Sequence, residues 1–432
     1  MQTLVTKKIK LFNAQQILES VSETANTKLY MFIGRPQEWP VETLPNDAYD
    51  TEEQEYRCWD EMLAMKQIYP SQVKIVIPRI DWSSGTVYTA YDDKANLTDT
   101  NFYVITSKFS VYKCISNNEG GPSTVEPSEQ KTEIIFLSDG YRWKYMYSLT
   151  AADQLGFLTA QWMPVNTDET IKAAAVDGQL DTILPIAQGS SYTTANTTVT
   201  IKGTGSNAIV NPIILNNKIA GYDIIDGGSG YKYADVVIES TDGEGADARA
   251  IIPPNKGHGE NPIFELDGYY IMFNTRFQFN EGVNDFPTDV RYRTIGLVRD
   301  PKNFNNEVIN LPTANTNYVL KVQYTAGSVF EKNDFITGNI SLANAFVIAS
   351  NVTSATNVDV RYMQSHNFTE NYKKFIVGEL ITSSTTGATG VVKQIYNPEV
   401  KPYTGDVLYV SNRTSIKRSS DQTENVHLVI EF

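Results

Sequence analysis

The residue types that most often carry catalysis or bind metals are sparse in this chain. Its 432 residues include only three histidines, His258, His366 and His427. The sequence contains no HExxH zinc motif, no CxxC pair, no GxSxG nucleophile elbow and no GxxxxGK phosphate loop. His258 lies in KGHGENP, where the flanking glycines would let a backbone approach a ligand, but a turn beside a proline-containing connector is the favoured interpretation. We therefore predict no catalytic site, no metal and no cofactor.

Two glycine-rich segments and one acidic segment could imitate ligand sites. The segments 203–205 (GTG) and 226–230 (DGGSG) have the composition of phosphate loops, but neither precedes a helical pattern whose N-terminus would face a phosphate. The acids of TDGEGADA could bind calcium weakly, but they lack EF-hand spacing. No local pattern among the 50 acidic residues marks a carboxylate pair of the glycosidase kind. Turns explain all three segments, including the acids Asp242, Glu244 and Asp247.

Four motifs rich in Trp, Arg and Pro stand out instead. They are FIGRPQEWP (32–40), VIPRIDW (76–82), SDGYRWKYMYSL (138–149) and the closing stretch 405–432. In the first three, a tryptophan lies within four residues of an arginine. Arginine beside tryptophan is typical of interface anchors, and it also seals the edges of β sandwiches, so both interpretations stay open. The candidate interaction residues are Arg35, Trp39, Arg79, Asp81, Trp82, Tyr141, Trp143 and Arg413.

The elements that must position these motifs are mostly strands. Short runs rich in β-branched and aromatic residues are separated by Gly, Asn, Asp and Pro, which is typical of antiparallel sheets. The last run alternates polar and apolar residues and predicts a strand with one buried face. The predicted strands are 73–80, 101–115, 132–137, 318–324 and 426–432.

Three segments predict helices, at residues 51–69, 151–158 and 13–22. The first two follow a Thr whose third following residue is Gln or Asp, which is the spacing of a capping box. Aromatic and methionine side chains fall on one face of the first helix. We interpret that face as packed on a sheet; a groove-binding helix is the alternative.

Internal repeats occupy two stretches. Within 189–252, two glycine-punctuated units are related, with Gly189 matched to Gly228 and Gly205 matched to Gly245. FITGNISLANAFV (335–347) aligns without gaps on LITSSTTGATGVV (380–392), a period of 45. Solenoids usually need three or more repeats, so two copies predict compact inserted β modules.

Composition and charge limit the class of protein. The chain is 41% hydrophobic and 20% charged, which is typical of a folded protein. A net charge of −14 disfavours nucleic acids and anionic membranes as partners. No apolar run approaches the ~20 residues of a membrane helix, and no signal peptide is expected. The only cysteines, Cys58 and Cys114, lie in apolar or aromatic surroundings and predict buried thiols.

The motifs carry a resemblance to a known family. GRPQEW, VIPRIDW and DGYRWKY, in this order, and the closing NRTSIKRSSDQTENVHLVIEF resemble the dimeric β-rich baseplate wedge subunit of T-even-type contractile-tailed bacteriophages. The resemblance covers about 30–165 and 405–432. The repeat-bearing stretches 170–255 and 325–400 have no counterpart in it.

The resemblance implies a non-enzymatic structural protein. It would act as a homodimer that joins neighbouring wedge proteins in the virion tail baseplate, after assembly in the host cytoplasm. It would move as a rigid body when the baseplate changes shape on host attachment. The acidic charge fits a protein that stays soluble before assembly.

The expected architecture is all-β, with several antiparallel sandwich-type domains, a few short helices and inserted β-hairpin repeat modules. A discontinuous core domain would combine 1–100, 285–325 and 400–432. The other predicted domains are 101–169 with a short helix, a Gly-rich insert at 170–256 and a hairpin insert at 326–399.

Two other functions stay open. A tail-fibre or receptor-binding adhesin would recognise host surface glycans through exposed aromatic residues of the Gly-rich module. Its only aromatic residues between 189 and 252 are Tyr192, Tyr222, Tyr231 and Tyr233. A carbohydrate-active enzyme on a β sandwich is the other alternative, and polysaccharide turnover lost on mutation of one acid would favour it.

Overall fold

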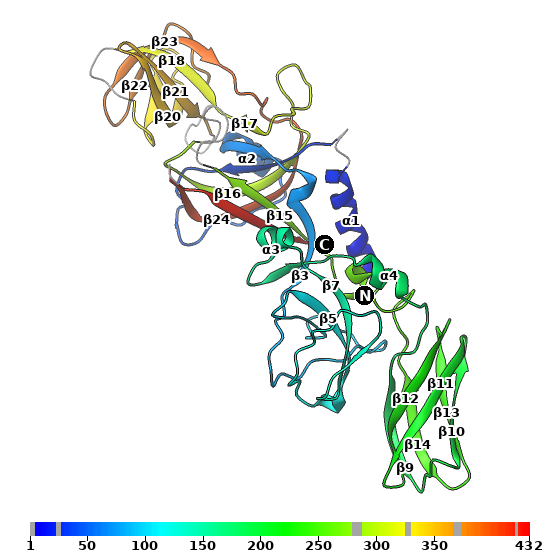
Figure 1. Ribbon diagram of the computed structural model, residues 1–432. Helices are drawn as coiled ribbons and strands as arrows, with labels where there is room; N and C mark the ends of the chain where they lie inside the picture. The colour runs from blue at the N-terminus through cyan, green and yellow to red at the C-terminus, as the bar shows by residue number, and fades with distance from the viewer. Residues whose placement is uncertain (1–4, 23–26, 279–286, 325–329, 366–372, 420–421) are drawn as a thin grey trace. The chain divides into compact units, whose positions relative to one another are not determined.

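The fold is that of a computed structural model, which describes all residues except 1–4, 23–26, 279–286, 325–329, 366–372 and 420–421. The chain is predominantly β and forms several sheets with a few short helices, as the sequence predicts (Figure 1). It divides into two compact units. Unit 1 comprises Met1–Gln16, Lys74–Met272 and Val429–Phe432, and unit 2 comprises Ile17–Val73 and Phe273–Leu428.

The helices are short and mostly capped. Thr150 accepts a hydrogen bond from the backbone N–H of Asp153, whose carboxylate accepts one from the backbone N–H of Thr150. This reciprocal pair is the predicted capping box, and it confirms the helix at 151–158. The helix predicted at 13–22 is also present but begins earlier. The helices are α1 (Lys7–Ser22), α2 (Glu52–Asp60), α3 (Ala151–Phe157), α4 (Glu169–Ala174) and α5 (Pro262–Glu265), with 3-10 turns η1 (Pro70–Gln72) and η2 (Asn118–Gly120).

The helix predicted over 51–69 is wrong in its second half. Thr51 caps α2 through its side chain as expected, but the helix ends at Asp60 and a strand, β2, follows. The residues 62–65 are all buried, and Met62 and Met65 pack in a core cluster with residues of α2 and of other strands. A strand buried on both faces reads as a continuous apolar run, which a helical face can imitate over a few residues.

Unit 2 contains a five-stranded antiparallel sheet with the order β17-β2-β1-β16-β24. The first of its strands in the chain, β1, is entirely buried and pairs with β2 and β16 on its two sides. Strand β16 pairs with β1 on one side and with β24, which ends at Arg418, on the other, so the sheet joins segments far apart in the sequence. Its strands are β1 (Leu29–Gly34), β2 (Met62–Gln67), β16 (Val290–Arg299), β17 (Thr313–Asn315) and β24 (Asp406–Arg418).

Unit 2 also contains a closed six-stranded barrel with the order β18-β21-β20-β19-β22-β23, in which β23 pairs back with β18 (Figure 1). The repeat residues predicted to correspond fill its core. Ile336 and Ile381, Ala343 and Ala388, and Val347 and Val392 are all buried. The strands are β18 (Tyr318–Tyr324), β19 (Phe335–Gly338), β20 (Asn344–Ser354), β21 (Asn357–Met363), β22 (Leu380–Ser383) and β23 (Thr389–Tyr396).

Unit 1 contains a four-stranded sheet with the order β4-β5-β7-β6 around an aromatic core. The predicted strand 101–115 is divided in two by a turn at Phe109, whose φ is 58°. Of the predicted strand 132–137, only two residues pair. The strands are β4 (Tyr103–Ile105), β5 (Ser110–Asn117), β6 (Ile135–Phe136) and β7 (Tyr141–Ser148).

The Gly-rich stretch of unit 1 forms a six-stranded sheet with the order β12-β11-β10-β13-β14-β9 (Figure 1). Its two related turns each bury a tyrosine against a glycine. Tyr192 packs on Gly243, and Tyr231 packs on Gly205, where no side chain would fit. The residue that corresponds to Gly205 is therefore Gly243, and the predicted match to Gly245 is wrong by two residues. The strands are β9 (Ile183–Ser190), β10 (Thr197–Gly203), β11 (Ser206–Leu215), β12 (Lys218–Ser229), β13 (Ala234–Ser240) and β14 (Glu244–Ala250).

A further sheet has four strands in the order β25-β15-β3-β8. The predicted strands at 73–80 and 426–432 are confirmed as β3 and β25. On β25, Leu428 is buried while His427 and Glu431 are exposed, as the alternation predicts. The domain boundaries predicted from the sequence stay predictions. The strands are β3 (Val73–Pro78), β8 (Trp162–Pro164), β15 (Tyr270–Phe277) and β25 (Glu424–Glu431).

Candidate functional site

The first Trp/Arg motif begins where strand β1 ends and its backbone turns. Gly34 lies at an irregularity in the pairing of β1 with β2, and Arg35 has a φ of 54°. A left-handed conformation is uncommon for a residue with a side chain and costs about 1–2 kcal/mol. The backbone N–H of Arg35 donates to the carbonyl of Glu61 at 2.8 Å, which fixes this turn against the end of α2. The strained backbone marks this place as a candidate site.

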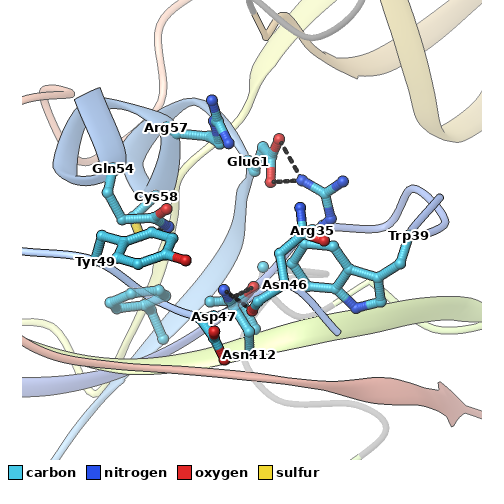
Figure 2. Close-up of a pocket in the computed structure, with 13 residues that line it drawn as sticks. Arg35, Trp39, Asn46, Asp47, Tyr49, Gln54, Arg57, Cys58, Glu61 and Asn412 are labelled. Carbon is cyan, nitrogen blue, oxygen red and sulfur yellow. Dashed lines mark hydrogen bonds and ion pairs between the residues drawn. The ribbon is translucent and has the colours of Figure 1, made fainter. Parts of the chain in front are cut away.

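The side chain of Arg35 is held between an acid and an aromatic ring (Figure 2). Its Nη1 donates to both carboxylate oxygens of Glu61, at 3.1 and 3.0 Å, and its guanidinium lies 3.8 Å from the ring centre of Trp39. All three residues are buried. Because an arginine stays charged, removal of either Glu61 or Trp39 would leave a buried cation with less compensation.

Trp39 connects this motif to the closing stretch of the sequence. Its indole Nε1 donates to the backbone carbonyl of Arg413 at 2.7 Å. The neighbouring Asn412 donates from Nδ2 to the carbonyl of Asn46 at 3.0 Å and accepts from Thr294 on β16. Two motifs far apart in the sequence therefore meet at one place. The side chain of Arg413 itself is exposed.

A small cavity of about 80 Å³ adjoins these residues. Its size suits a few water molecules and not a small-molecule substrate. Burial raises the pKa of the Cys58 thiol to about 11, so this cysteine is not an activated nucleophile. The arrangement can pack and hold chain segments, and it offers no paired nucleophile and base. The cavity is lined by Phe32, Gly34, Arg35, Trp39, Asn46, Asp47, Tyr49, Gln54, Arg57, Cys58, Glu61, Thr294 and Asn412 (Figure 2).

The second motif lies in unit 1. Arg79 forms an ion pair with Asp81, with Nη2 at 2.8 Å from Oδ1, and its Nη1 donates to the carbonyl of Thr159 at 3.0 Å. The Arg79–Asp81 pair is partly exposed, so it contributes little to stability. Trp82 is half-buried and donates from Nε1 to the Oγ of Ser123 at 3.1 Å. This motif also ties separate segments to one another.

The third motif forms the aromatic core of the same unit. The rings of Tyr141 and Trp143 are fully buried and stack at 5.6 Å. The hydroxyl of Tyr141 donates to the carbonyl of Gly121 at 2.6 Å and accepts from the backbone N–H of Tyr88 at 3.2 Å. Burial raises the pKa of Tyr141, so its hydroxyl stays protonated and keeps donating. Trp82 packs against the same core.

The eight predicted residues therefore form two sets. Unit 2 brings Arg35, Trp39 and the backbone of Arg413 together around the small cavity. Unit 1 brings Trp82, Tyr141 and Trp143 together in one core, with the Arg79–Asp81 pair on the same motif as Trp82. The tryptophans at 39 and 143 are buried within the single chain, whereas Trp82 keeps part of its surface exposed.

A buried ionisable cluster in unit 1 was missed by the sequence analysis. Lys113 on β5 is fully buried, with its Nζ 2.8 Å from Oε2 of Glu265 and 3.1 Å from Nδ1 of His258. The ring of Tyr91 covers the ammonium group at 4.1 Å. The backbone N–H of Gly259 donates to Glu265 Oε1 at 2.7 Å. The glycines beside His258 thus form a turn that holds a carboxylate, which agrees with the turn interpretation.

The charges of this cluster compensate one another. Burial lowers the pKa of Lys113, although Glu265 opposes that shift. Burial disfavours the Glu265 carboxylate, but Lys113 and His258 outweigh it and lower its pKa to about 2. Burial and the charge of Lys113 both lower the pKa of His258, so His258 is neutral near pH 7. The only sequence signal was a lysine inside an otherwise apolar strand.

The segments that could imitate ligand sites behave as turns. Asp242 accepts hydrogen bonds from Thr193, Asn196 and Ser240, so its carboxylate closes a loop. Among the described residues, no three His, Cys, Asp or Glu side chains are grouped as metal ligands. Both cysteines are buried free thiols, as predicted. In the described part of the chain, no helix is long and apolar enough to cross a membrane. His366 lies outside the described residues.

Comparisons with known proteins do not name a relative. No protein-family model matches this chain, and a search of the curated proteins finds no match.

Proposed function

We propose that this chain is a structural subunit of the contractile-tail baseplate wedge of a T-even-like bacteriophage. In this proposal it acts without catalysis, as a homodimer that joins neighbouring wedge proteins in the virion. It assembles in the host cytoplasm and moves as a rigid body when the baseplate changes shape on host attachment.

One observation carries the proposal: the motifs that resemble this family hold separate chain segments together. Trp39 bonds to the backbone at Arg413, Trp82 bonds to Ser123, and Tyr141 bonds to the backbone at Gly121. Each indole or phenol places its polar atom on a partner while its ring is wholly or partly buried. Such anchoring supports a part that keeps its shape under load.

The Arg35 cavity supports the same proposal. A catalytic pocket would place a nucleophile, a base and an oxyanion donor around one reacting atom. Around this cavity, the arginine is already engaged by Glu61 and Trp39, and the thiol has a raised pKa. The geometry favours a structural contact between the motif segments over a substrate site.

The test of this function is quantitative mass spectrometry on gradient-purified contractile tails from the source phage. We expect the chain in intact tails, at dimeric stoichiometry relative to another wedge protein. Absence from purified tails would contradict the proposal. Trimeric stoichiometry would favour the adhesin alternative, and glycan binding would then be the next assay.

The adhesin alternative depended on exposed aromatic residues in the Gly-rich module. Tyr192, Tyr222 and Tyr231 are buried there, and only Tyr233 is largely exposed. A single exposed ring is a poor platform for stacking on sugars. This observation favours the wedge proposal over the adhesin alternative.

A further inference from the structure

The barrel of unit 2 is an internal duplication whose halves are related by a pseudo-twofold axis. Strands β19 and β22 pair antiparallel, with Ile336 opposite Ser383 and Gly338 opposite Ile381. Given the repeat period of 45, these are reciprocal pairs of equivalent residues. The backbone bonds repeat in the same way: Asn333 bonds to Val347 at 2.9 Å, and Gly378 bonds to Val392 at 2.8 Å. One half can therefore serve as an internal control for the other.

Each half lends one buried carboxylate to the other. Asp334 accepts from Ser384 Oγ at 2.9 Å and from the backbone N–H of Thr385 at 3.1 Å. Its equivalent, Glu379, accepts from the backbone N–H and the Oγ of Ser341, both at 2.9 Å. Both carboxylates are buried. Each carboxylate therefore holds a loop of its own half against a loop of the other half, once on either side of the pseudo-twofold axis.

These tied loops form two equivalent tips. The apolar tip comprises residues 339–342 and 376–380, and the polar tip comprises residues 384–387 and 331–335. In the apolar tip, five aliphatic side chains are exposed by between 37 and 65% of their surface. They are Ile340 at 65%, Leu342 at 60%, Ile376 at 49%, Val377 at 58% and Leu380 at 37%.

The polar tip shows that these loops do not need aliphatic residues. The equivalents of Ile340 and Leu342 are Thr385 and Gly387, and those of Ile376 and Val377 are Glu331 and Lys332. The fifth equivalent, Phe335, packs edge-on against Phe346. The same backbone is thus built from polar residues at one end and from exposed aliphatic residues at the other. Loop structure alone does not account for the difference.

Leu342 adds a second, independent observation. Its φ is 59°, and the equivalent Gly387 has a φ of 68°. Glycine adopts this left-handed conformation freely, whereas leucine is strained there. Leu342 is also 60% exposed, so most of this strained residue is not packed in the barrel core. Such outliers persist mainly where they have a function.

We propose that the apolar tip is a docking surface that inserts into an apolar pocket of a different protein. Its exposed side chains cover on the order of 400 Å², the size of the largest apolar patch on an ordinary monomer. Obligate homodimers bury about 2,000 Å² or more in total, about 1,000 Å² on each partner, whereas transient contacts between different proteins can bury under about 1,200 Å² in total. The area therefore favours insertion into a pocket of a different protein over pairing with a second copy.

The chemistry of the tip also favours a protein over a membrane. Its exposed apolar side chains are all aliphatic, with no Trp or Tyr, whereas membrane-interface segments are enriched in Trp and Tyr. A pocket for such a knob would be lined by apolar residues and would bury the tip side chains as anchors. This inference concerns the chain's own surface and does not depend on the proposed function.

The decisive variant exchanges the apolar tip for the residues that the polar tip carries. Ile340→Thr, Leu342→Gly, Ile376→Glu and Val377→Lys would be combined in the full chain. Because each new residue already occupies the equivalent place in the other half, the barrel should stay folded. The matched control is Thr385→Ser, which changes the polar tip and leaves the apolar tip intact.

The partner is identified by photo-cross-linking in the cells in which the protein is naturally made. The photo-reactive residue p-benzoylphenylalanine replaces Ile340 or Val377 in the apolar tip, or Thr385 in the polar tip as the control position. We expect one and the same identified protein to be cross-linked from 340 and 377, and not from 385. That protein, once purified, should bind the four-residue variant at least about tenfold more weakly than the wild type or the control.

Each other outcome has a defined meaning. Cross-links to a second copy of this chain, or no cross-link from the tip of a folded chain, would overturn the inference. Tip-dependent sedimentation with phosphatidylcholine–phosphatidylglycerol vesicles would overturn it in favour of a membrane. An identified partner that is a tail protein would support the proposed function as well. A partner that never enters tails would contradict the proposed function but leave the docking surface standing.

Discussion

The two tips of the duplicated barrel share one backbone design and differ in what they show to solvent. Each is closed by a buried acid from the opposite half, Asp334 for one and Glu379 for the other. At one left-handed position the polar tip carries Gly387 and the apolar tip carries Leu342, and at the other the polar tip carries Asn333 and the apolar tip carries Gly378. The comparison separates stability from binding. The buried acid stabilises the barrel in both tips, whereas the exposed side chains differ between the tips and can serve binding.

The acids themselves differ in a compensated way. A side chain at Gly338 would collide with the longer acid Glu379, whose Oε2 lies 2.5 Å from the place of the added Cβ. At the equivalent place, Ser383 carries a hydroxyl that donates to the shorter acid Asp334. The longer acid therefore pairs with glycine and the shorter acid pairs with serine. Volume is conserved across the pair, as close-packed interiors require.

The largest expected effect comes from removing an acid. Glu379→Ala would leave the backbone N–H groups of Ile340, Ser341 and Ile376 without their acceptor in a partly buried place. We expect a loss of about 2 kcal/mol in the free energy of unfolding, since an unsatisfied buried donor costs about 1–3 kcal/mol and water can reach part of this place. Asp334→Ala should cost a similar amount. Urea unfolding followed by circular dichroism measures both, and a cost below about 1 kcal/mol for either would show that the acids are dispensable.

A second expectation concerns pH. Burial disfavours both carboxylates, but the hydrogen bonds of Ser383 and Thr385 on Asp334, and of Ser341 and Ile376 on Glu379, outweigh it and lower both pKa values. A lowered folded-state pKa means that the stabilisation is complete above the unfolded value, about 4, and is lost as the pH falls through the folded value.

This pH effect is measured by hydrogen exchange of barrel amides, because Glu265 in unit 1 also titrates in acid. The double variant Asp334→Asn with Glu379→Gln should be less stable than the wild type at neutral pH. It should also lose less protection on acidification, since amides do not titrate there. Equal losses in variant and wild type would show that other acids control the barrel.

The size of the acid and its facing residue gives a sharper comparison. Gly338→Ser alone should destabilise the barrel by about 2 kcal/mol, because it overpacks the space of Glu379. Combined with Glu379→Asp, the same change reproduces the pair found in the other half and should recover most of that loss. A double-mutant cycle on unfolding free energies gives the coupling between the two positions. Additive effects would contradict the compensated pairing.

The sequence predicted the duplication but not the closed barrel or the exchange of acids between its halves. The period of 45 places Ile336 with Ile381 and Val347 with Val392, and all four residues are buried. Closure into a barrel and the exchange of acids depend on pairing between the repeats, which leaves no local pattern in either one. The helix predicted to continue past Asp60 failed for a related reason, since burial between β1 and β17 decided the structure of 62–67.

The candidate site was foreseen only in part. The spacing of Arg35 and Trp39 indicated a contact, and the two side chains are stacked. Glu61 is 26 residues from Arg35 in the sequence, and Glu265 is 152 residues from Lys113. Ion-pair partners at such separations carry no signature in a single sequence. What can be read from the sequence is the unexpected residue, such as a lysine inside an apolar strand, and not its partner.

The smallest expected effect is also the one that best separates fold from function. Leu342→Gly relieves a left-handed leucine, which costs about 1–2 kcal/mol, but it adds the chain entropy of glycine, about 0.5–1 kcal/mol. The net result should be a gain of up to about 1 kcal/mol in the free energy of unfolding. The reciprocal change, Gly387→Leu, should cost up to about 1 kcal/mol, because the strain that the polar tip gains exceeds the chain entropy recovered by removing glycine. Thermal unfolding of the two variants beside the wild type measures both changes in stability.

A loss of stability in Leu342→Gly would mean that this side chain contributes to the stability of the barrel. A gain would show that Leu342 lowers the stability of the barrel. Its presence would then be explained by a contact that its side chain makes outside the barrel.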